Sequence, residues 1–240
     1  MTNNVLLNNV DHQDLTIDTR HGAAFGDAVN QVLIFPTEYE DIQREYPILF
    51  RKDEAGQFQS IALLGLDEDE NLFLGESGWD ARYIPAMQAR GPFSIALQEE
   101  PGEAHAQPMI HVDLDHPRVG AVGGERLFLR HGGNAPYLEH VTEVLRLIYT
   151  GLEVSKPMFA AFAELELIRP VSIEARLSED EQYLLPDFHV IDEQRLAALD
   201  GAGLDMLHRR GFLRAAFLAA ASLGNVTRLI EMKNRRRATI

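Results

Sequence analysis

Short apolar runs separated by turn residues make up the first half of the chain. Runs of this length, bounded by glycine, proline or acidic residues, are typical of β-strands. Residues 28–35 end at Pro36, which cannot continue a strand ladder. Residues 46–51 and 58–66 flank a loop that predicts a β-hairpin. Further strands are expected at 71–74, 93–97 and 109–114, and a helix at 80–89.

The second half has the periodicity of helices instead. Apolar residues recur at spacings of three and four from Leu138 to Ile148, just after the helix-start residues Asn134 and Pro136. Two strand-like stretches follow at 171–175 and 182–191, and Asp192 is a candidate N-cap. Helices over 203–210, 212–223 and 226–237 are predicted at the end of the chain.

Strands first and helices later are typical of an α+β protein rather than of an alternating α/β protein. We therefore expect a mostly antiparallel β-sheet in the N-terminal half, packed against C-terminal helices. Residues 1–25 are polar and irregular, and are interpreted as an N-terminal arm. Residues 26–240 are interpreted as a single domain, β-rich over 28–114 and helix-rich over 134–237.

Composition narrows the classes of function. The 240 residues include 37 acidic against 22 basic side chains, for a formal charge of -15. An acidic body repels nucleic acid and anionic membrane surfaces, so no nucleic-acid partner is expected. Because no apolar run reaches about 18 residues and the first residues do not resemble a signal peptide, we expect no membrane insertion and a cytoplasmic location. The chain has no cysteine, which excludes disulfides and thiolate metal sites.

The predicted helix over 212–223, with the sequence FLRAAFLAAASL, is apolar nearly all round. Such a helix is usually buried on several sides. Either it lies in the interior of the fold, or one face completes a homodimer. Arg214 is then expected to reach the surface or an acidic partner, because an unpaired buried charge is very costly.

Several linked motifs between residues 46 and 93 carry a family resemblance. They are YPILF, ALLGL, NLFL and GWDARYIPA, in this order, with a terminal PF. GERLF at 124–128, VIDE at 190–193 and SLGN at 222–225 continue the pattern. On these motifs the chain resembles the SapC family over residues 30–230.

The resemblance implies associations rather than a reaction. The SapC family takes its name from a component linked to bacterial surface layers. Its members are associated with flavin-dependent tryptophan halogenases, cupin-like dioxygenase relatives and outer-membrane receptors. The resemblance implies no catalytic residue and no cofactor.

The sharpest candidate for binding lies between residues 78 and 92. This stretch holds the only tryptophan, and tryptophan, tyrosine and arginine are the residues that anchor interfaces. In a helix starting near residue 80, Trp79 and Tyr83 would share one face, and could equally fill the core where that helix meets the sheet. The candidate binding residues are Trp79, Asp80, Arg82, Tyr83 and Arg90.

No metal site is predicted, although one alternative has the right residue types. His111 and Asp113 form an H-x-D motif in a predicted strand, where alternation places both side chains on one face. Two histidines and one carboxylate are the ligands of non-haem iron oxygenases. His189 could be the second histidine and Arg195 the counter-ion of a cosubstrate. The other interpretation is an edge strand with polar residues facing water.

The sequence contains no recognisable nucleotide-binding or hydrolase motif. We therefore expect a non-catalytic accessory or binding protein that acts with a protein or peptide partner and has no cofactor. The partner would be an enzyme of the halogenase or cupin-like dioxygenase type, or the peptide substrate of that enzyme. The alternatives are an iron-dependent oxygenase that uses His111, Asp113 and His189, and a surface-layer-associated component.

Overall fold

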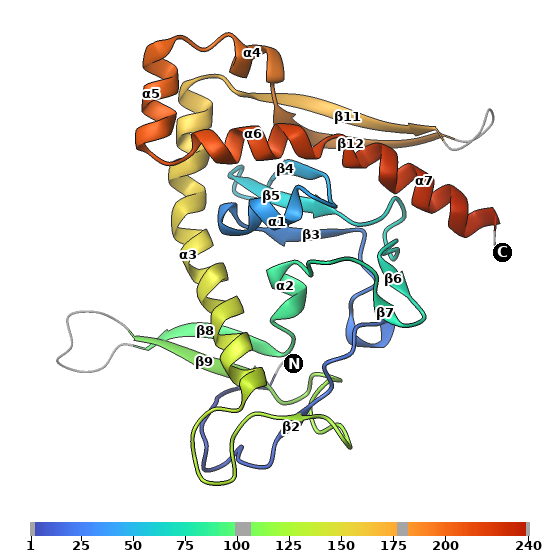
Figure 1. Ribbon diagram of the computed structural model, residues 1–240, viewed down its shortest axis with the longest axis vertical. Helices are drawn as coiled ribbons and strands as arrows, with labels where there is room; N and C mark the ends of the chain where they lie inside the picture. Colours follow the sequence, from blue (N-terminus) through green and yellow to red (C-terminus); the bar gives the residue numbers. More distant parts are fainter. Residues whose placement is uncertain (1–2, 99–106, 177–181, 239–240) are drawn as a thin grey trace. The chain divides into compact units, whose positions relative to one another are not determined.

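The computed structural model describes residues 3–98, 107–176 and 182–238 (Figure 1). The chain divides into two compact units, which are described separately. Unit 1 comprises the described residues within 1–27 and 86–149, and unit 2 those within 28–85 and 150–240. The long helix α3 (Pro136–Glu164) begins in unit 1 and ends in unit 2. The description of residues 26–240 as one domain stays a prediction.

Unit 1 is built on a three-stranded antiparallel sheet with the strand order β1-β9-β8. The first turns of α3 pack against its core, which includes Ile17, Phe93, Val112 and Leu138. Residues 4–6 and 16–17, in the stretch expected to be an arm, form the strands β1 and β2. The elements of this unit besides α3 are β1 (Asn4–Leu6), β2 (Thr16–Ile17), η1 (Ala23–Phe25), α2 (Ala86–Ala89), β8 (Phe93–Gln98), β9 (Gln107–Asp113) and β10 (Glu125–Arg126).

Unit 2 is built on a five-stranded antiparallel sheet with the order β11-β12-β4-β5-β3. Its central strand β4 buries Ile48, Leu49 and Phe50 in succession, so both faces of the sheet are covered there. On one face Phe50 meets Phe159 of α3 edge to face, with ring centroids 5.1 Å apart. The elements besides α3 are β3 (Gln31–Ile34), η2 (Pro36–Glu38), α1 (Tyr39–Ile42), β4 (Ile48–Lys52), β5 (Phe58–Leu63), β6 (Leu74–Gly75), β7 (Gly78–Trp79), β11 (Ile168–Arg176), β12 (Gln182–Ile191), α4 (Glu193–Ala197), α5 (Gly201–Arg209), α6 (Leu213–Ser222) and α7 (Asn225–Ala238).

The α+β class with antiparallel sheets and mostly C-terminal helices is confirmed, although the strands within residues 28–114 belong to more than one sheet. β8 and β9 form their sheet with β1, whereas β11 and β12 join β4 through the pairing of His189 with Phe50. The physical reason is that β4 is buried, so its backbone N–H and C=O groups are shielded from water and need a hydrogen-bonding strand at each edge. β5 supplies one of these neighbours and β12 the other.

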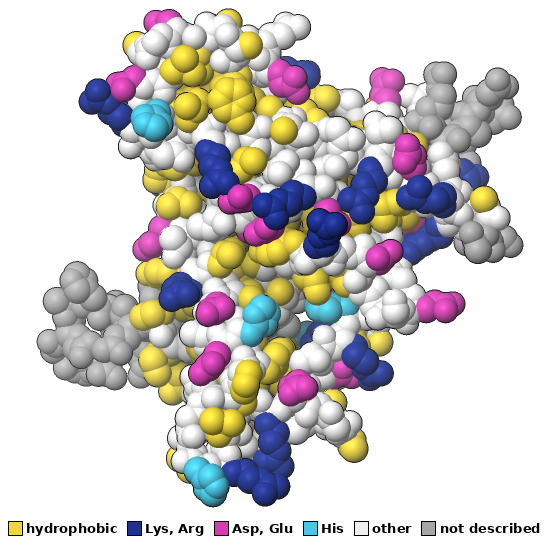
Figure 2. All heavy atoms as spheres, viewed as in Figure 1, with side chains coloured by type: hydrophobic (Ala, Val, Ile, Leu, Met, Phe, Trp, Pro, Cys, Tyr) yellow, Lys and Arg dark blue, Asp and Glu magenta, His cyan; other side chains and the backbone are white. Residues whose placement is uncertain are grey.

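Helix α6 confirms what was expected of Arg214. Ala215, Ala216, Ala219 and Ala220 are buried, whereas Arg214 reaches the surface and pairs with Glu40 at 2.6 Å. Figure 2 shows basic and acidic side chains close to one another over apolar ones on this face of unit 2. Phe217 remains 53% exposed on the outer side of α6. Homodimerisation stays a prediction.

The basic end of the chain is docked onto unit 2. Lys233 of α7 is only 8% exposed, and its Nζ lies 2.5 Å from Asp67 and 2.7 Å from Glu70. The guanidinium of Arg236 donates to the carbonyl oxygens of Asn71 and Leu74. The acidic turn at 67–70 therefore serves as the docking point for α7.

We expect Gly151→Ala to destabilise the protein, although alanine normally stabilises a helix relative to glycine. Alanine is favoured over glycine by about 1 kcal/mol inside a helix. However, a Cβ at Gly151 of α3 would lie 2.3 Å from Cβ of Phe35 and 2.8 Å from Oγ1 of Thr37. Overpacking of this kind costs about 1–3 kcal/mol, so we expect a net loss of about 1–2 kcal/mol in urea unfolding.

Gly201→Ala is the matched control, because nothing lies within 4 Å of a Cβ at this first position of α5. It is expected to leave the free energy of unfolding unchanged or to raise it slightly. Equal effects of the two substitutions would contradict the packing at Gly151.

Candidate functional site

The segment that carries the predicted binding residues is irregular rather than helical between residues 80 and 85. Trp79 ends the short strand β7, and α2 begins only at Ala86, so the expected helix over 80–89 is wrong for residues 80–85. The reason is Pro85, which disfavours a helical conformation at Ile84 and is itself tolerated only where a helix starts. Trp79 and Tyr83 therefore do not share a helical face.

Both aromatic residues are instead linked through Tyr46, which is fully buried. The Tyr46 hydroxyl accepts a hydrogen bond from Trp79 Nε1 at 2.8 Å and donates one to the carbonyl oxygen of Tyr83 at 2.6 Å. The Tyr46 ring lies against Phe73, with ring centroids 4.4 Å apart. Burial raises the pKa of Tyr46, so the hydroxyl keeps its proton and can act as this donor.

Tyr83 is tied to the core a second time, through the buried carboxylate of Glu38. The Tyr83 hydroxyl donates to Glu38 Oε2 at 2.9 Å, and the backbone N–H of Phe35 donates to Oε1 at 3.0 Å. Burial and the negative charge of Glu38 raise the pKa of Tyr83. The two aromatic side chains thus anchor the segment to unit 2.

The polar residues of the same segment face outwards. Asp80 and Arg82 are exposed, and their backbone N–H groups donate to the Phe73 carbonyl at 2.6 Å and to Glu45 Oε2 at 2.8 Å. The Arg82 guanidinium makes no hydrogen bond or ion pair with any residue that the structure describes. An irregular backbone held by hydrogen bonds therefore presents to solvent a cation that has no partner among the described residues.

Arg90, the fifth predicted binding residue, belongs to unit 1 and follows α2. Its Nη1 donates to the carbonyl oxygen of Phe93 at 2.6 Å, while its Nε is buried without a hydrogen-bond partner. Burial lowers the pKa of Arg90. No carboxylate among the described residues forms an ion pair with it.

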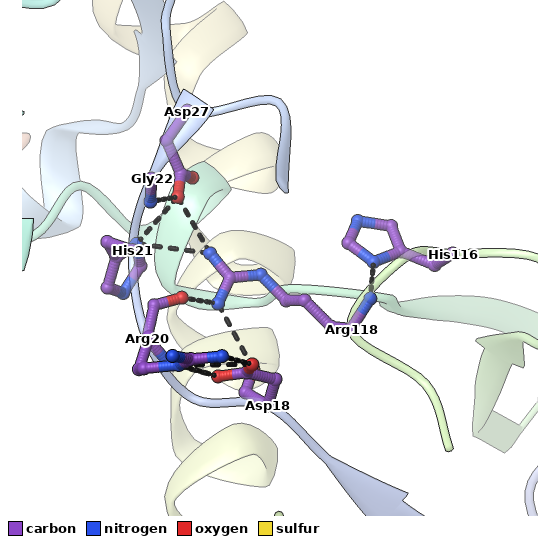
Figure 3. Close-up of polar contacts among 7 residues, drawn as sticks. All are labelled: Asp18, Arg20, His21, Gly22, Asp27, His116 and Arg118. Atoms are coloured by element: carbon purple, nitrogen blue, oxygen red, sulfur yellow. Dashed lines mark hydrogen bonds and ion pairs between the residues drawn. The ribbon is translucent and has the colours of Figure 1, made fainter. Parts of the chain in front are cut away.

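Another polar cluster, this one in unit 1, surrounds Arg118, which is 3% exposed (Figure 3). Its Nη2 donates to Asp27 Oδ2 at 2.8 Å, and its Nη1 donates to the carbonyl oxygens of Asp18 and Arg20. Nδ1 of His21 lies 3.2 Å from the same Asp27 oxygen. The guanidinium also stacks over the Phe25 ring, 4.6 Å from its centroid. Arg118 thereby holds the loop 18–27 in place.

The electrostatics of this cluster favour an ionised Asp27. Burial opposes the ionisation, but the hydrogen bonds from His21 and from the backbone of Gly22 and the positive charge of Arg118 hold the pKa of Asp27 below its ordinary value. Hydrogen bonds from Arg20 lower the pKa of the neighbouring Asp18 to about 2. The cluster therefore contains a compensated buried ion pair.

The family model named SapC matches residues 7–229, which is nearly the whole chain and includes every motif quoted above. The chain belongs to the SapC family. No curated protein and no solved structure matches it. The membership confirms the resemblance seen in the sequence, and it leaves the partner and the biochemical role to be inferred from the residues of this SapC protein.

The iron-site alternative gains no support from the geometry of the SapC chain. Asp113 accepts hydrogen bonds from the backbone N–H groups of Asn3 and Asp115, and Arg195 lies 3.5 Å from Glu166. Burial and then the charge of Lys52 lower the pKa of His189, whose Nδ1 is buried without a partner. Among the described residues, no three of His, Asp and Glu are grouped so that they could hold a metal ion.

The interpretation of residues 109–114 as an edge strand is wrong, because β9 lies between β1 and β8. Residues 4–6 supply the unexpected partner strand, and their polar surroundings gave no sign of a strand.

Within residues 3–98, 107–176 and 182–238, no helix is long and apolar enough to cross a membrane.

Proposed function

We propose that this SapC protein is a non-catalytic accessory protein that binds a partner through the exposed residues of segment 78–85. The partner would be an enzyme of the flavin-dependent tryptophan halogenase or cupin-like dioxygenase type, or the peptide substrate of such an enzyme, in the cytoplasm. The family association suggests these partner classes, and the geometry of the segment supports a binding role.

The observation that carries the proposal is the Arg82 guanidinium, which has no partner within the described part of the chain, on a backbone held by hydrogen bonds. Glu45 and Tyr46 fix the segment, so Arg82 loses little backbone freedom when it meets a partner. Arginine can donate two parallel hydrogen bonds to a carboxylate or several to peptide carbonyls. Trp79 and Tyr83, half-buried beside it, would contribute apolar area rather than specificity.

We expect Arg82→Ala to weaken partner binding about tenfold while leaving the melting temperature nearly unchanged. Binding would be measured by biolayer interferometry against a purified halogenase and a purified cupin-like dioxygenase from the same genome, and against a peptide substrate of each. Arg209→Ala is the matched control, because Arg209 is an exposed arginine of the same unit that already pairs with Asp205.

Tyr83→Phe separates binding from folding. It removes the hydrogen bond to the buried Glu38 and is expected to cost about 1–3 kcal/mol of stability. Because Arg82 stays in place, the folded variant should still bind. Unchanged affinity in Arg82→Ala, for every partner that the native protein binds, would refute the proposed surface.

A further inference from the structure

Helix α7 and segment 78–85 share a largely buried carboxylate, that of Glu45. Its Oε2 accepts from the Arg82 backbone N–H at 2.8 Å, and its Oε1 lies 3.6 Å from Nη2 of Arg228 in α7. The Glu45 side chain is only 12% exposed, so its charge is poorly hydrated and is stabilised by both contacts. Arg228 therefore helps to hold the carboxylate that in turn holds the backbone at Arg82.

Two arginines of α7 also contact the residues that lead into the segment. The Arg228 guanidinium lies over the Phe73 ring, 5.9 Å from its centroid. The Phe73 carbonyl oxygen accepts from the Asp80 backbone N–H at 2.6 Å. Arg236 donates to the carbonyl oxygen of Leu74 in β6, so the C-terminal part of α7 reaches this strand (Figure 1). Both backbone hydrogen bonds that hold Asp80 and Arg82 thus end on residues that α7 contacts.

The docking of α7 is mainly polar. Of its 14 residues, all of which the structure describes, Leu229 and Lys233 are buried. The Lys233 ammonium is held by the acidic turn at 67–70. At the start of α7, the Asn225 side-chain amide donates to the carbonyl oxygen of Tyr46 at 3.1 Å. An element that buries few apolar side chains opens at a lower free energy than the core of the protein does.

We propose that α7 is a regulatory helix that orders segment 78–85 for its partner when it is docked and releases the segment when it detaches. With α7 docked, Glu45 and Phe73 hold the backbone, and Arg82 meets the partner in a fixed place. With α7 detached, Arg228 leaves Glu45, and the partner has to order the segment at a cost in affinity. Docking of α7 and partner binding then favour each other, and this coupling is reciprocal. The inference rests on the function proposed above and adds its regulation.

The first experiment needs no partner, because it follows hydrogen–deuterium exchange of the full chain by mass spectrometry. Lys233→Met replaces the apolar stem of the side chain but removes the ammonium that pairs with Asp67 and Glu70. It should raise the exchange rate about tenfold in α7 and several-fold in segment 78–85, while the core strand β4 exchanges at the native rate. Arg228→Met, at a side chain that is 40% exposed, is the second variant and should have the same effect on the segment.

The second experiment repeats the measurement of partner binding with the same variants. Lys233→Met and Arg228→Met should each weaken the binding about three- to tenfold. Arg209→Met is the matched control, because Arg209 is an exposed arginine of unit 2 that pairs with Asp205 within α5. It should leave both exchange and affinity unchanged. A bound partner should also slow the exchange of α7 in the native chain, which a helix with only a structural role would not show.

The regulatory role and the binding surface fail in different ways. If Lys233→Met and Arg228→Met leave the exchange of segment 78–85 unchanged, or bind the partner as the native protein does, the regulatory role is overturned. The binding surface still stands in that case, provided that Arg82→Ala weakens binding. If Arg82→Ala binds as the native protein does, the binding surface itself is refuted, and the regulation proposed for it is refuted as well.

Discussion

Arg118→Met is expected to lower the free energy of unfolding by about 3–5 kcal/mol. The substitution replaces the apolar stem of the side chain but removes the guanidinium, so Asp27 is left as a buried carboxylate without the cation of Arg118; the Asp27 side chain is only 2% exposed. It also removes the donors to the carbonyl oxygens of Asp18 and Arg20. Urea unfolding followed by circular dichroism would measure the loss.

Two control variants separate the stability lost with the ion pair from the stability lost by removing any arginine side chain. Arg126→Met removes an exposed arginine whose surface pairing with Asp14 is worth about 0–1 kcal/mol. The double variant Arg118→Met/Asp27→Leu removes both charges and should lose less stability than Arg118→Met alone. If Arg118→Met unfolded at the same urea concentration as the native protein, the buried pair would have no structural role.

The ion pair between Arg118 and Asp27 also makes the free energy of unfolding depend on pH. The pKa of Asp27 is lowered in the folded protein, so its contribution is fully present above the ordinary carboxyl pKa of about 3.9 and is lost as the pH falls towards the lower folded value. Stability should therefore fall more steeply with acidification below about pH 4 in the native protein than in the double variant.

Leu63→Ala should cost about 2–5 kcal/mol. Leu63 is 1% exposed in β5, where it follows the buried residues Ile61 and Ala62. Truncation removes packing and leaves a cavity that the surrounding strands can close only in part. The melting temperature of the variant is the simplest measurement.

Leu184→Ala is the matched control for this loss. Leu184 occupies a strand of the same sheet but is 58% exposed, so its truncation should change stability by less than about 0.5 kcal/mol. Equal melting temperatures for Leu63→Ala and the native protein would show that β5 is not part of the core.

The local elements could be predicted because their signals are local. The apolar run at 58–63 and the turn residues before it mark a strand, and the spacing from Leu138 to Ile148 marks α3. Asp192 is an N-cap as expected, since its carboxylate accepts from the backbone N–H groups of Gln194 and Arg195. The pairing of strands has no such signal, because β4 could have found its second neighbour anywhere in the chain. The sequence therefore predicts the α+β class but not the division of the strands among separate sheets.

The candidate sites, like the strand pairing, depend on contacts between residues that are distant in the sequence. Pro85 is a local signal that should have restricted the helix to residues after it. The link from Trp79 and Tyr83 to Tyr46 joins distant residues and leaves no trace in the pattern. Arg118 lies in a glycine-rich loop and Asp27 just after the polar N-terminal stretch, so nothing in either neighbourhood indicates that they pair. Arg90 was selected for its residue type, and its buried Nε became visible only in three dimensions.

The interleaving of the two units along the chain limits when each can form during translation. Unit 1 needs residues up to 149, and the sheet of unit 2 needs β12, which ends at Ile191. The apolar strands β3, β4 and β5 therefore emerge from the ribosome long before their last partner strand does. Non-local pairing of this kind slows folding and exposes strand edges to aggregation. Because the two units are interleaved, unit 2 could be expressed alone only if residue 85 were joined to residue 150. A fragment that ends at residue 149 would leave β4 without β12.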